Sequence, residues 1–294
     1  MRLLLKPVDM LSLSFIGLLS AVTLAFFPLI PIWGWLVTRY ALLALAVISV
    51  ASYNGRTHPW KPAVYLQAFL PVLIVMVIFD SLGDLIPRLW PHYFDDVLIK
   101  IDYALFGVHP TLWTERLIHA GLTTALQFAY ISYYPMSIAL AVVLLLKNKR
   151  EEFDTAVFGL ILCFYLSYVG YILFPAVGPR FTLAHLQTTG LQANSLTTAI
   201  QNTLNGLEYN KTDAFPSGHT AVALMTLYYA WKSGEKALTW VLLPLVSGLI
   251  FATVYLRYHY VIDVIAGILL TAVTIYLAPK LYEGLSRLTK PSDG

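Results

Sequence analysis

Long apolar runs constrain this chain more than any other feature of its sequence. Charged residues make up 12% of the 294 residues, whereas soluble domains contain roughly 25%. A helix that crosses a hydrocarbon core needs about 20 apolar residues. The sequence therefore predicts an all-α integral membrane protein. We expect eight transmembrane helices, of which the sixth is short, near residues 9–29, 34–52, 63–83, 123–146, 153–174, 217–231, 237–256 and 260–279.

Two long connections interrupt this series of apolar runs. Residues 84–122 combine tryptophan, proline and mixed charges, a composition typical of short helices that lie at a membrane surface. Residues 175–216 form the second connection. We expect surface helices in these outer loops.

The distribution of basic residues predicts the orientation of the helices. With the N-terminus inside, 12 of the 19 lysines and arginines fall in inner segments, as expected for cytoplasmic loops. Both termini are then cytoplasmic. The connection 175–216 and the turn near 257–260 lie on the outer face, which is periplasmic, extracellular or lumenal. The first apolar run continues past Phe27 without a small-x-small cleavage site, which favours a retained anchor over a signal peptide.

Charge and cysteine content exclude several other classes of protein. The net charge of +3 is small and spread along the chain, so it gives no indication of nucleic-acid binding. Cys163 is the single cysteine, which excludes an intrachain disulfide and a cysteine-based metal cage.

Three polar stretches share the predicted outer face: residues 174–181 (FPAVGPRF), 214–219 (AFPSGH) and 256–267 (LRYHYVIDVIAG). In the third stretch, His259 and Asp263 are four residues apart. If the helix has begun by His259, both side chains project from one face. The carboxylate can then fix the imidazole tautomer and leave the other nitrogen as a nucleophile or base. A purely structural pair is the alternative, because an ionisable residue within an apolar helix needs a partner.

The second stretch runs Pro-Ser-Gly-His into an apolar helix. A helix N-terminus binds anions, and Gly218 allows a ligand to approach the backbone closely. His219 can donate a proton to a leaving oxygen. The alternatives are that Ser217 is a plain N-cap and that His219 is an interfacial histidine.

Arginines occur in the other two stretches. The guanidinium groups of Arg180 and Arg257 match phosphate oxygens in geometry and charge, although either arginine alone also suits a lipid headgroup contact. Together with two histidines, an aspartate and a helix N-terminus, they predict a site for a phosphate ester at the membrane surface.

The combination of PSGH with His-x-x-x-Asp some forty residues later resembles the type 2 phosphatidic acid phosphatase superfamily. Its members are membrane lipid phosphatases and phosphotransferases, with relatives among soluble haloperoxidases. The resemblance covers residues 63–280, six of the eight expected helices. It leaves residues 1–62 as two N-terminal transmembrane helices and residues 281–294 as a cytoplasmic tail.

The resemblance implies a role for each matching residue. His259 is similar to the nucleophile that forms a phosphohistidine, Asp263 to its orienting carboxylate, and His219 to the acid that protonates the leaving group. No metal and no cofactor is implied. The phosphate-binding positions of the motifs correspond to Ser217, Gly218 and Arg180.

The chain departs from the common motifs at several positions. Where the first motif has lysine and proline around its arginine, this chain has Leu173 and Phe181. Where the third motif has Ser-Arg, it has Ala252 and Thr253. Arg257, two residues before the histidine, could replace that arginine as a phosphate contact. The chain looks more like the inositol phosphorylceramide synthase branch, whose members pass phosphoinositol to a lipid alcohol instead of water. Three features carry this likeness: the pattern GPR…PSGH…RYHYxxD, the two extra helices and the segment IDYALFGVHPT.

The function that these observations predict is a metal-independent phosphatase or phosphotransferase acting on a phospholipid or polyprenyl phosphate. The two activities share the covalent step, so the acceptor stays open. A transporter that uses His219, His259 and Asp263 as a proton relay is the alternative from another class. It is disfavoured because the residues cluster at one face and no repeated halves are visible. A zinc site at the histidines lacks a clear third ligand.

Overall fold

The computed structural model describes residues 4–56, 60–192, 194–207 and 210–289. Within these ranges the regular structure is entirely helical, which confirms the predicted all-α class. The α-helices are α1 (Pro7–Ala25), α2 (Trp33–Asn54), α3 (Lys61–Leu89), α4 (Asp95–Phe106), α5 (Pro110–Trp113), α6 (Ala120–Ile131), α7 (Tyr133–Leu146), α8 (Arg150–Leu173), α9 (Pro179–Thr182), α10 (Ser195–Leu207), α11 (Gly218–Lys232), α12 (Lys236–Tyr255) and α13 (Val261–Thr289). Three short 3-10 turns cover Phe27–Leu29, Thr114–Leu117 and Ala184–Leu186.

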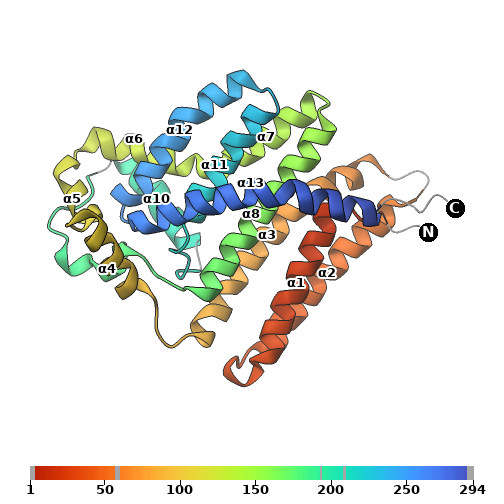
Figure 1. Cartoon of the computed structure of the whole chain (residues 1–294), viewed down its shortest axis with the longest axis horizontal. Coiled ribbons are helices and arrows are strands. Elements are labelled where there is room, and N and C mark those ends of the chain that lie inside the picture. Colours follow the sequence, from red (N-terminus) through yellow and green to blue (C-terminus); the bar gives the residue numbers. More distant parts are fainter. Residues whose placement is uncertain (1–3, 57–59, 193, 208–209, 290–294) are drawn as a thin grey trace.

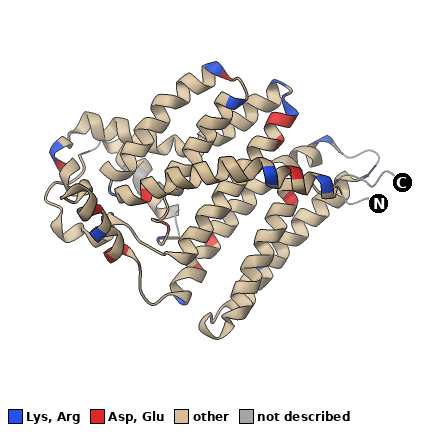
Figure 2. Cartoon of the chain, in the orientation of Figure 1, with Lys and Arg blue, Asp and Glu red and all other residues tan. Residues whose placement is uncertain are grey.

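Six of the described helices are long and apolar enough to cross a membrane: α1, α2, α3, α8, α12 and α13. The pair α6 and α7 makes a seventh if the two form one span. These helices fit a multi-pass membrane protein, and Figure 2 shows their ribbons largely free of charged residues. The count of eight stays a prediction, because α11 has only 15 residues, fewer than the roughly 20 that a hydrocarbon core requires.

The predicted helix over 123–146 is divided in two. α6 and α7 meet at Ser132 with a bend of 45°. Pro135 has no N–H to donate to the carbonyl of Ile131 one turn earlier, and a missing bond of this kind bends a helix. The Ser132 hydroxyl instead donates to the carbonyl of Ala129 at 2.6 Å. Near this bend, Tyr130 of α6 contacts His219 at the start of α11.

The last helix is longer than the sequence predicted. α13 continues to Thr289, so most of the segment expected as a tail (281–294) is helical, and residues 290–294 lie outside the described residues. A helix satisfies its own backbone hydrogen bonds, so α13 can continue as a helix beyond the apolar layer. Arg287 and Glu283, four residues apart, pair at 2.5 Å on its exposed surface.

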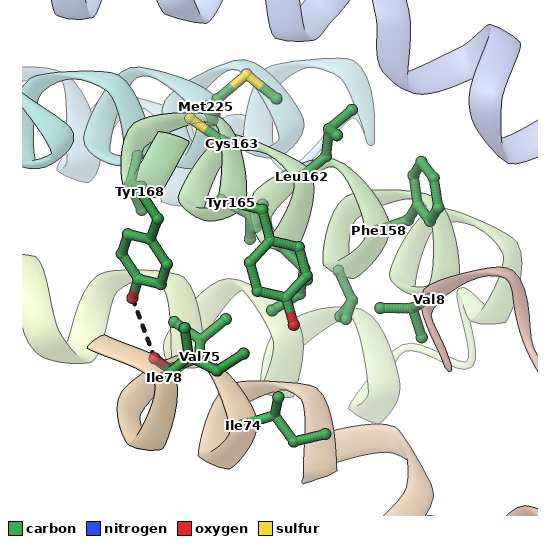
Figure 3. Packing of buried hydrophobic residues seen from close by; sticks show 14 of the residues in the cluster. Val8, Ile74, Val75, Ile78, Phe158, Leu162, Cys163, Tyr165, Tyr168 and Met225 are labelled. Carbon is green, nitrogen blue, oxygen red and sulfur yellow. Dashed lines mark hydrogen bonds between the residues drawn. The ribbon is translucent and has the colours of Figure 1, made fainter. Parts of the chain in front are cut away.

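The centre of the bundle is α8. Two thirds of its apolar stretch is buried, a larger share than in any other described candidate span, and it contacts α1, α3, α7, α11 and α13. Figure 3 shows Tyr168 pointing toward α3, where its hydroxyl donates to the Val75 carbonyl at 3.1 Å. On the α1 side, Phe15 stacks on Tyr165 with ring centroids 4.3 Å apart.

The surface helices expected in the two long connections are present as α4, α5 and α10. In Figure 1 they gather at one end of the molecule, beside the start of α13, and both termini lie at the opposite end. Two of the three polar stretches contact these helices directly: α4 accepts backbone N–H groups of Gly178 and Val261, and Asn205 of α10 accepts from Arg180.

Candidate active site

A small pocket opens at this end of the bundle. All three polar stretches contribute to it, so the structure brings Arg180, His219 and His259 together. The lining residues are Tyr130, Val177, Arg180, Phe181, Asn210, Lys211, Asp213, Ala214, His219, Tyr258 and His259.

His259 lies in the turn before α13 and is only 3% exposed. Its Nδ1 is 2.8 Å from the carbonyl oxygen of Ala214. Because a carbonyl oxygen only accepts, Nδ1 must carry the proton. In the neutral ring, Nε2 then has the lone pair, and this atom faces Nδ1 of His219 at 3.4 Å.

His219 is the second residue of α11 and connects His259 to a tyrosine. Its Nε2 is 3.0 Å from the hydroxyl of Tyr130, whose ring stacks on the imidazole with centroids 4.9 Å apart. One set of tautomers satisfies every contact: Tyr130 donates to His219 Nε2, His219 Nδ1 donates to His259 Nε2, and His259 Nδ1 donates to Ala214. The pocket thus holds a directed chain of hydrogen bonds that runs from Tyr130 through both histidines to the carbonyl of Ala214.

Asp263 is placed differently from the sequence expectation. α13 begins at Val261, so His259 precedes the helix. The Oδ2 atom of Asp263 is 3.5 Å from Nδ1 of His259 and accepts the N–H of Tyr260 at 2.8 Å. Asp263 therefore caps the start of α13, as acidic residues at the third helical position do. The carbonyl of Ala214, not the carboxylate, makes the shorter contact with the histidine.

Two cations line the pocket. Arg180 donates from Nη1 to Asn205 Oδ1 at 2.9 Å, and its guanidinium lies 4.8 Å from the ring centre of Tyr258. Lys211 donates to the backbone carbonyl of Asn205 at 2.8 Å. Asp213 adds a carboxylate to the same lining. The sequence had singled out only Arg180 of these three.

Arg257 is directed away from the pocket. Its guanidinium donates to Gln187 Oε1 at 2.8 Å and to Glu115 Oε1 at 2.9 Å, and it also contacts the carbonyl of Thr189. Its backbone has a left-handed φ of 65°. Burial lowers the pKa of the guanidinium, and Glu115 opposes this shift. The turn aims the Arg257 side chain at the loops around Glu115 and Gln187, and its expected phosphate contact stays a prediction.

Ser217 and Gly218 also lie outside the pocket lining. Ser217 is fully buried, and its Oγ accepts the N–H of Thr220 at 3.2 Å, so it serves as the N-cap of α11. A side chain at Gly218 would collide with the hydroxyl of Tyr171. The close approach that this glycine allows is therefore to a tyrosine of α8.

Gly178 of the GPR stretch meets a strict backbone requirement. Its φ is 87°, and a Cβ at this position would lie 2.5 Å from the carbonyl oxygen of Tyr258. Only glycine tolerates both conditions. The tight contact places Arg180, two residues later, beside the ring of Tyr258.

Tyr130, Lys211 and Asp213 are pocket residues that sequence reasoning missed. Tyr130 lies within an apolar run, 89 residues before its partner His219, so no local pattern marks it. Lys211 and Asp213 stand shortly before the PSGH motif, and that proximity is the one signal in the sequence that marks them. Among the described residues, no group of three histidine, cysteine, aspartate or glutamate side chains is arranged to hold a metal ion.

Comparison with known proteins finds a match to a family model. No curated protein and no solved structure matches the chain. A family model described as the PAP2 superfamily matches residues 96–277, more than half of the 294 residues. The match runs from α4 into α13 and contains every residue that lines the pocket. It confirms the resemblance at the level of the superfamily and supports a phosphatase-type activity, while the inositol phosphorylceramide synthase-like branch stays a prediction. The chain, with a histidine pair and two cations at one end of an apolar helical bundle, belongs to the PAP2 superfamily.

Proposed function

We propose that this protein is a membrane lipid-phosphate phosphatase or phosphotransferase that works through a phosphohistidine on His259. The observation that carries the proposal is the orientation of this residue. Its Nδ1 is held by the Ala214 carbonyl at 2.8 Å, and its Nε2 faces the second histidine across the pocket. A neutral imidazole held in this way has its lone pair on Nε2, which can attack phosphorus once the phosphoryl group replaces the contact with His219.

The first step forms a bond between Nε2 of His259 and the phosphorus. The bond from phosphorus to the leaving oxygen breaks, and His219 gives that oxygen a proton. The Nδ1 atom of His219 is the proposed donor, because it carries the proton of that ring. This proton is shared with Nε2 of His259 at 3.4 Å, so the incoming phosphoryl group has to replace that hydrogen bond before His219 serves the leaving oxygen. Tyr130 supports the ring of His219 from the other side.

The second step releases the phosphoryl group. The oxygen of water or of an alcohol attacks the phosphorus, His219 takes its proton, and the nitrogen–phosphorus bond to His259 breaks. Water yields a phosphatase and an alcohol yields a phosphotransferase. Transfer of the kind performed by inositol phosphorylceramide synthases is one version of the second outcome.

Arg180 and Lys211 are the cations proposed to bind the phosphate oxygens. Both line the pocket, and hydrogen bonds to charged donors are the strong ones for phosphate. Ser217 and Gly218 act through the backbone at the start of α11, and Asp263 orients the His259 turn. The substrates proposed are phospholipids or polyprenyl phosphates, whose apolar chains remain in the bilayer beside the pocket.

The proposed topology places both termini in the cytoplasm and the pocket on the outer face. The distribution of lysines and arginines supports it. So does the start of α13, next to the pocket residue His259, which lies at the end of the molecule opposite the termini in Figure 1.

The test uses purified protein in detergent with a panel of phospholipids and polyprenyl pyrophosphates. Free phosphate and new phosphodiester lipid are recorded together for wild type, His259→Ala and a control, His185→Ala, whose exposed side chain lies outside the pocket. Phosphate release that requires His259 establishes the phosphatase. A new phosphodiester lipid without free phosphate establishes the transferase. If no lipid gives either product, the proposal fails and the transport alternative takes its place.

A further inference from the structure

The surface helix α4 carries two buried carboxylates on one face. Asp95 and Asp102 are seven residues apart, which is about two helical turns, and their exposed fractions are 4% and 2%. A buried carboxylate is costly unless donors compensate it. The donors here come from the two segments that flank the pocket.

Asp95 holds the GPR segment. Its Oδ2 accepts the N–H of Val177 at 2.9 Å and its Oδ1 accepts the N–H of Gly178 at 2.8 Å. These amides lie two and three residues before Arg180. The carboxylate therefore fixes the backbone from which the pocket arginine projects.

Asp102 holds the start of α13. Its Oδ2 accepts the N–H of Val261 at 2.9 Å and its Oδ1 accepts the N–H of Ile262 at 2.8 Å. The first amides of a helix have no partner within the helix, and these two begin just after His259. Burial raises the pKa of Asp102, and the two N–H bonds oppose the shift.

Tyr260 connects the two carboxylate contacts. It follows His259 directly, is 1% exposed, and donates its hydroxyl to Asp95 Oδ1 at 2.9 Å. The same hydroxyl lies 2.6 Å from Thr182 Oγ1, just beyond Arg180. The turn of the nucleophile and the segment of the phosphate-binding arginine are thus joined through α4.

We propose that α4 is a positioning element of the active site, with Asp95 and Asp102 setting the placement of Arg180 relative to His259. The catalytic part of this inference rests on the proposed function. A displacement of about 1 Å at a reacting centre lowers a rate by as much as roughly 100-fold. The two carboxylates are positioning residues, because they line no part of the pocket and act on backbone amides.

The variants are Asp95→Asn, Asp102→Asn and Tyr260→Phe, with Asp96→Asn as the matched control. Asp96 lies on the same helix and is exposed. An asparagine offers one oxygen in place of two, and its NH2 faces one of the backbone donors. Each Asp→Asn variant therefore frees a backbone amide of one segment, while the other aspartate still holds the backbone amides of the other segment.

Hydrogen exchange measured by mass spectrometry on the full-length protein tests the contacts without any substrate. Asp95→Asn should speed exchange in the peptide that contains residues 177–178. Asp102→Asn should speed it in the peptide that contains residues 261–262, and Asp96→Asn should change neither. Unchanged exchange in both aspartate variants would overturn the inference.

Kinetic measurements distinguish a positioning role of the two carboxylates from a role in fold stability alone. We expect kcat to fall at least tenfold in both aspartate variants, with a smaller change in KM. The assay is run well below the Tm of every variant, so that the folded fraction is equal in all of them. Faster exchange with unchanged kcat would show that α4 only stabilises the fold. If the aspartate variants do not fold, Tyr260→Phe tests the inference by removing one hydroxyl, and we expect at least a threefold fall in kcat. If the wild type processes no lipid phosphate, the proposed function fails, and the exchange result alone decides whether α4 holds the two segments.

Discussion

Removal of the Tyr130 hydroxyl is the sharpest perturbation of the proposed chemistry. The hydroxyl is 3.0 Å from Nε2 of His219, and Tyr130 is 1% exposed. Tyr130→Phe keeps the ring that stacks on the imidazole and removes only the hydrogen bond. A buried acceptor left without its donor costs about 1–2 kcal/mol. If that cost applies to the proton transfer, kcat falls about 5–30-fold.

The control for this substitution is Tyr255→Phe. The Tyr255 hydroxyl is also buried and lies 2.8 Å from Thr123 Oγ1, but it contacts neither histidine. Both substitutions remove one buried hydroxyl contact, so both should lower Tm by a similar small amount. Only Tyr130→Phe should lower kcat, as measured by phosphate release or lipid transfer at saturating substrate.

Two results would refute this reasoning. One is a Tyr130→Phe protein with wild-type kcat, which would mean that His219 needs no support from the tyrosine. The other is an equal loss of kcat in Tyr255→Phe, which would mean that the effect comes from general loosening of the bundle.

Three further substitutions test other parts of the structure. Arg257→Lys should lower Tm, at a cost of about 1–3 kcal/mol in the free energy of unfolding, because one ammonium cannot hold all three partners of the guanidinium. KM should stay nearly unchanged; a large rise in KM at unchanged Tm would instead assign Arg257 to phosphate binding. Gly178→Ala should lower kcat more than tenfold and cost about 1–3 kcal/mol from its left-handed backbone alone, whereas Gly190→Ala, where a Cβ meets open space, should change neither. Hydrogen bonds from two lysines lower the pKa of Glu235. Its contribution to the stability of the fold is therefore present above the ordinary glutamate pKa of about 4.5 and is lost as the pH falls through the pKa of the folded state. Glu235→Gln should flatten the decrease of Tm in that acidic range, and an unchanged decrease would contradict this assignment.

The apolar runs predicted most of the helices, because a segment surrounded by lipid must satisfy its own backbone hydrogen bonds and can do so only as a helix. They did not predict the bend at Ser132 or the continuation of α13 to Thr289. The bend depends on a missing N–H one turn away, and the extension depends on polar residues that a hydropathy pattern assigns to a tail. Neither is visible in the average hydropathy of a segment.

The approach of Arg180, His219 and His259 to one another could be foreseen. Each stands where an expected helix meets an outer connection, so the alternating direction of the helices places all three at one face. The direction of each side chain could not be foreseen. Arg257 is only two residues from His259, yet it faces Glu115, because one left-handed residue in the turn reverses its direction.

From the sequence alone we predicted a helical membrane protein of the PAP2 superfamily, and the helical fold and the superfamily are confirmed. Both could be predicted because hydropathy and short motifs are local properties of a chain. Which atoms meet depends on the packing of the helices: the carbonyl of Ala214 contacts His259, the hydroxyl of Tyr130 contacts His219, and the carboxylates of α4 contact the two segments beside the pocket. These contacts join residues 45 to 159 positions apart in the chain. Their geometry comes from how the helices pack, and no single segment encodes it.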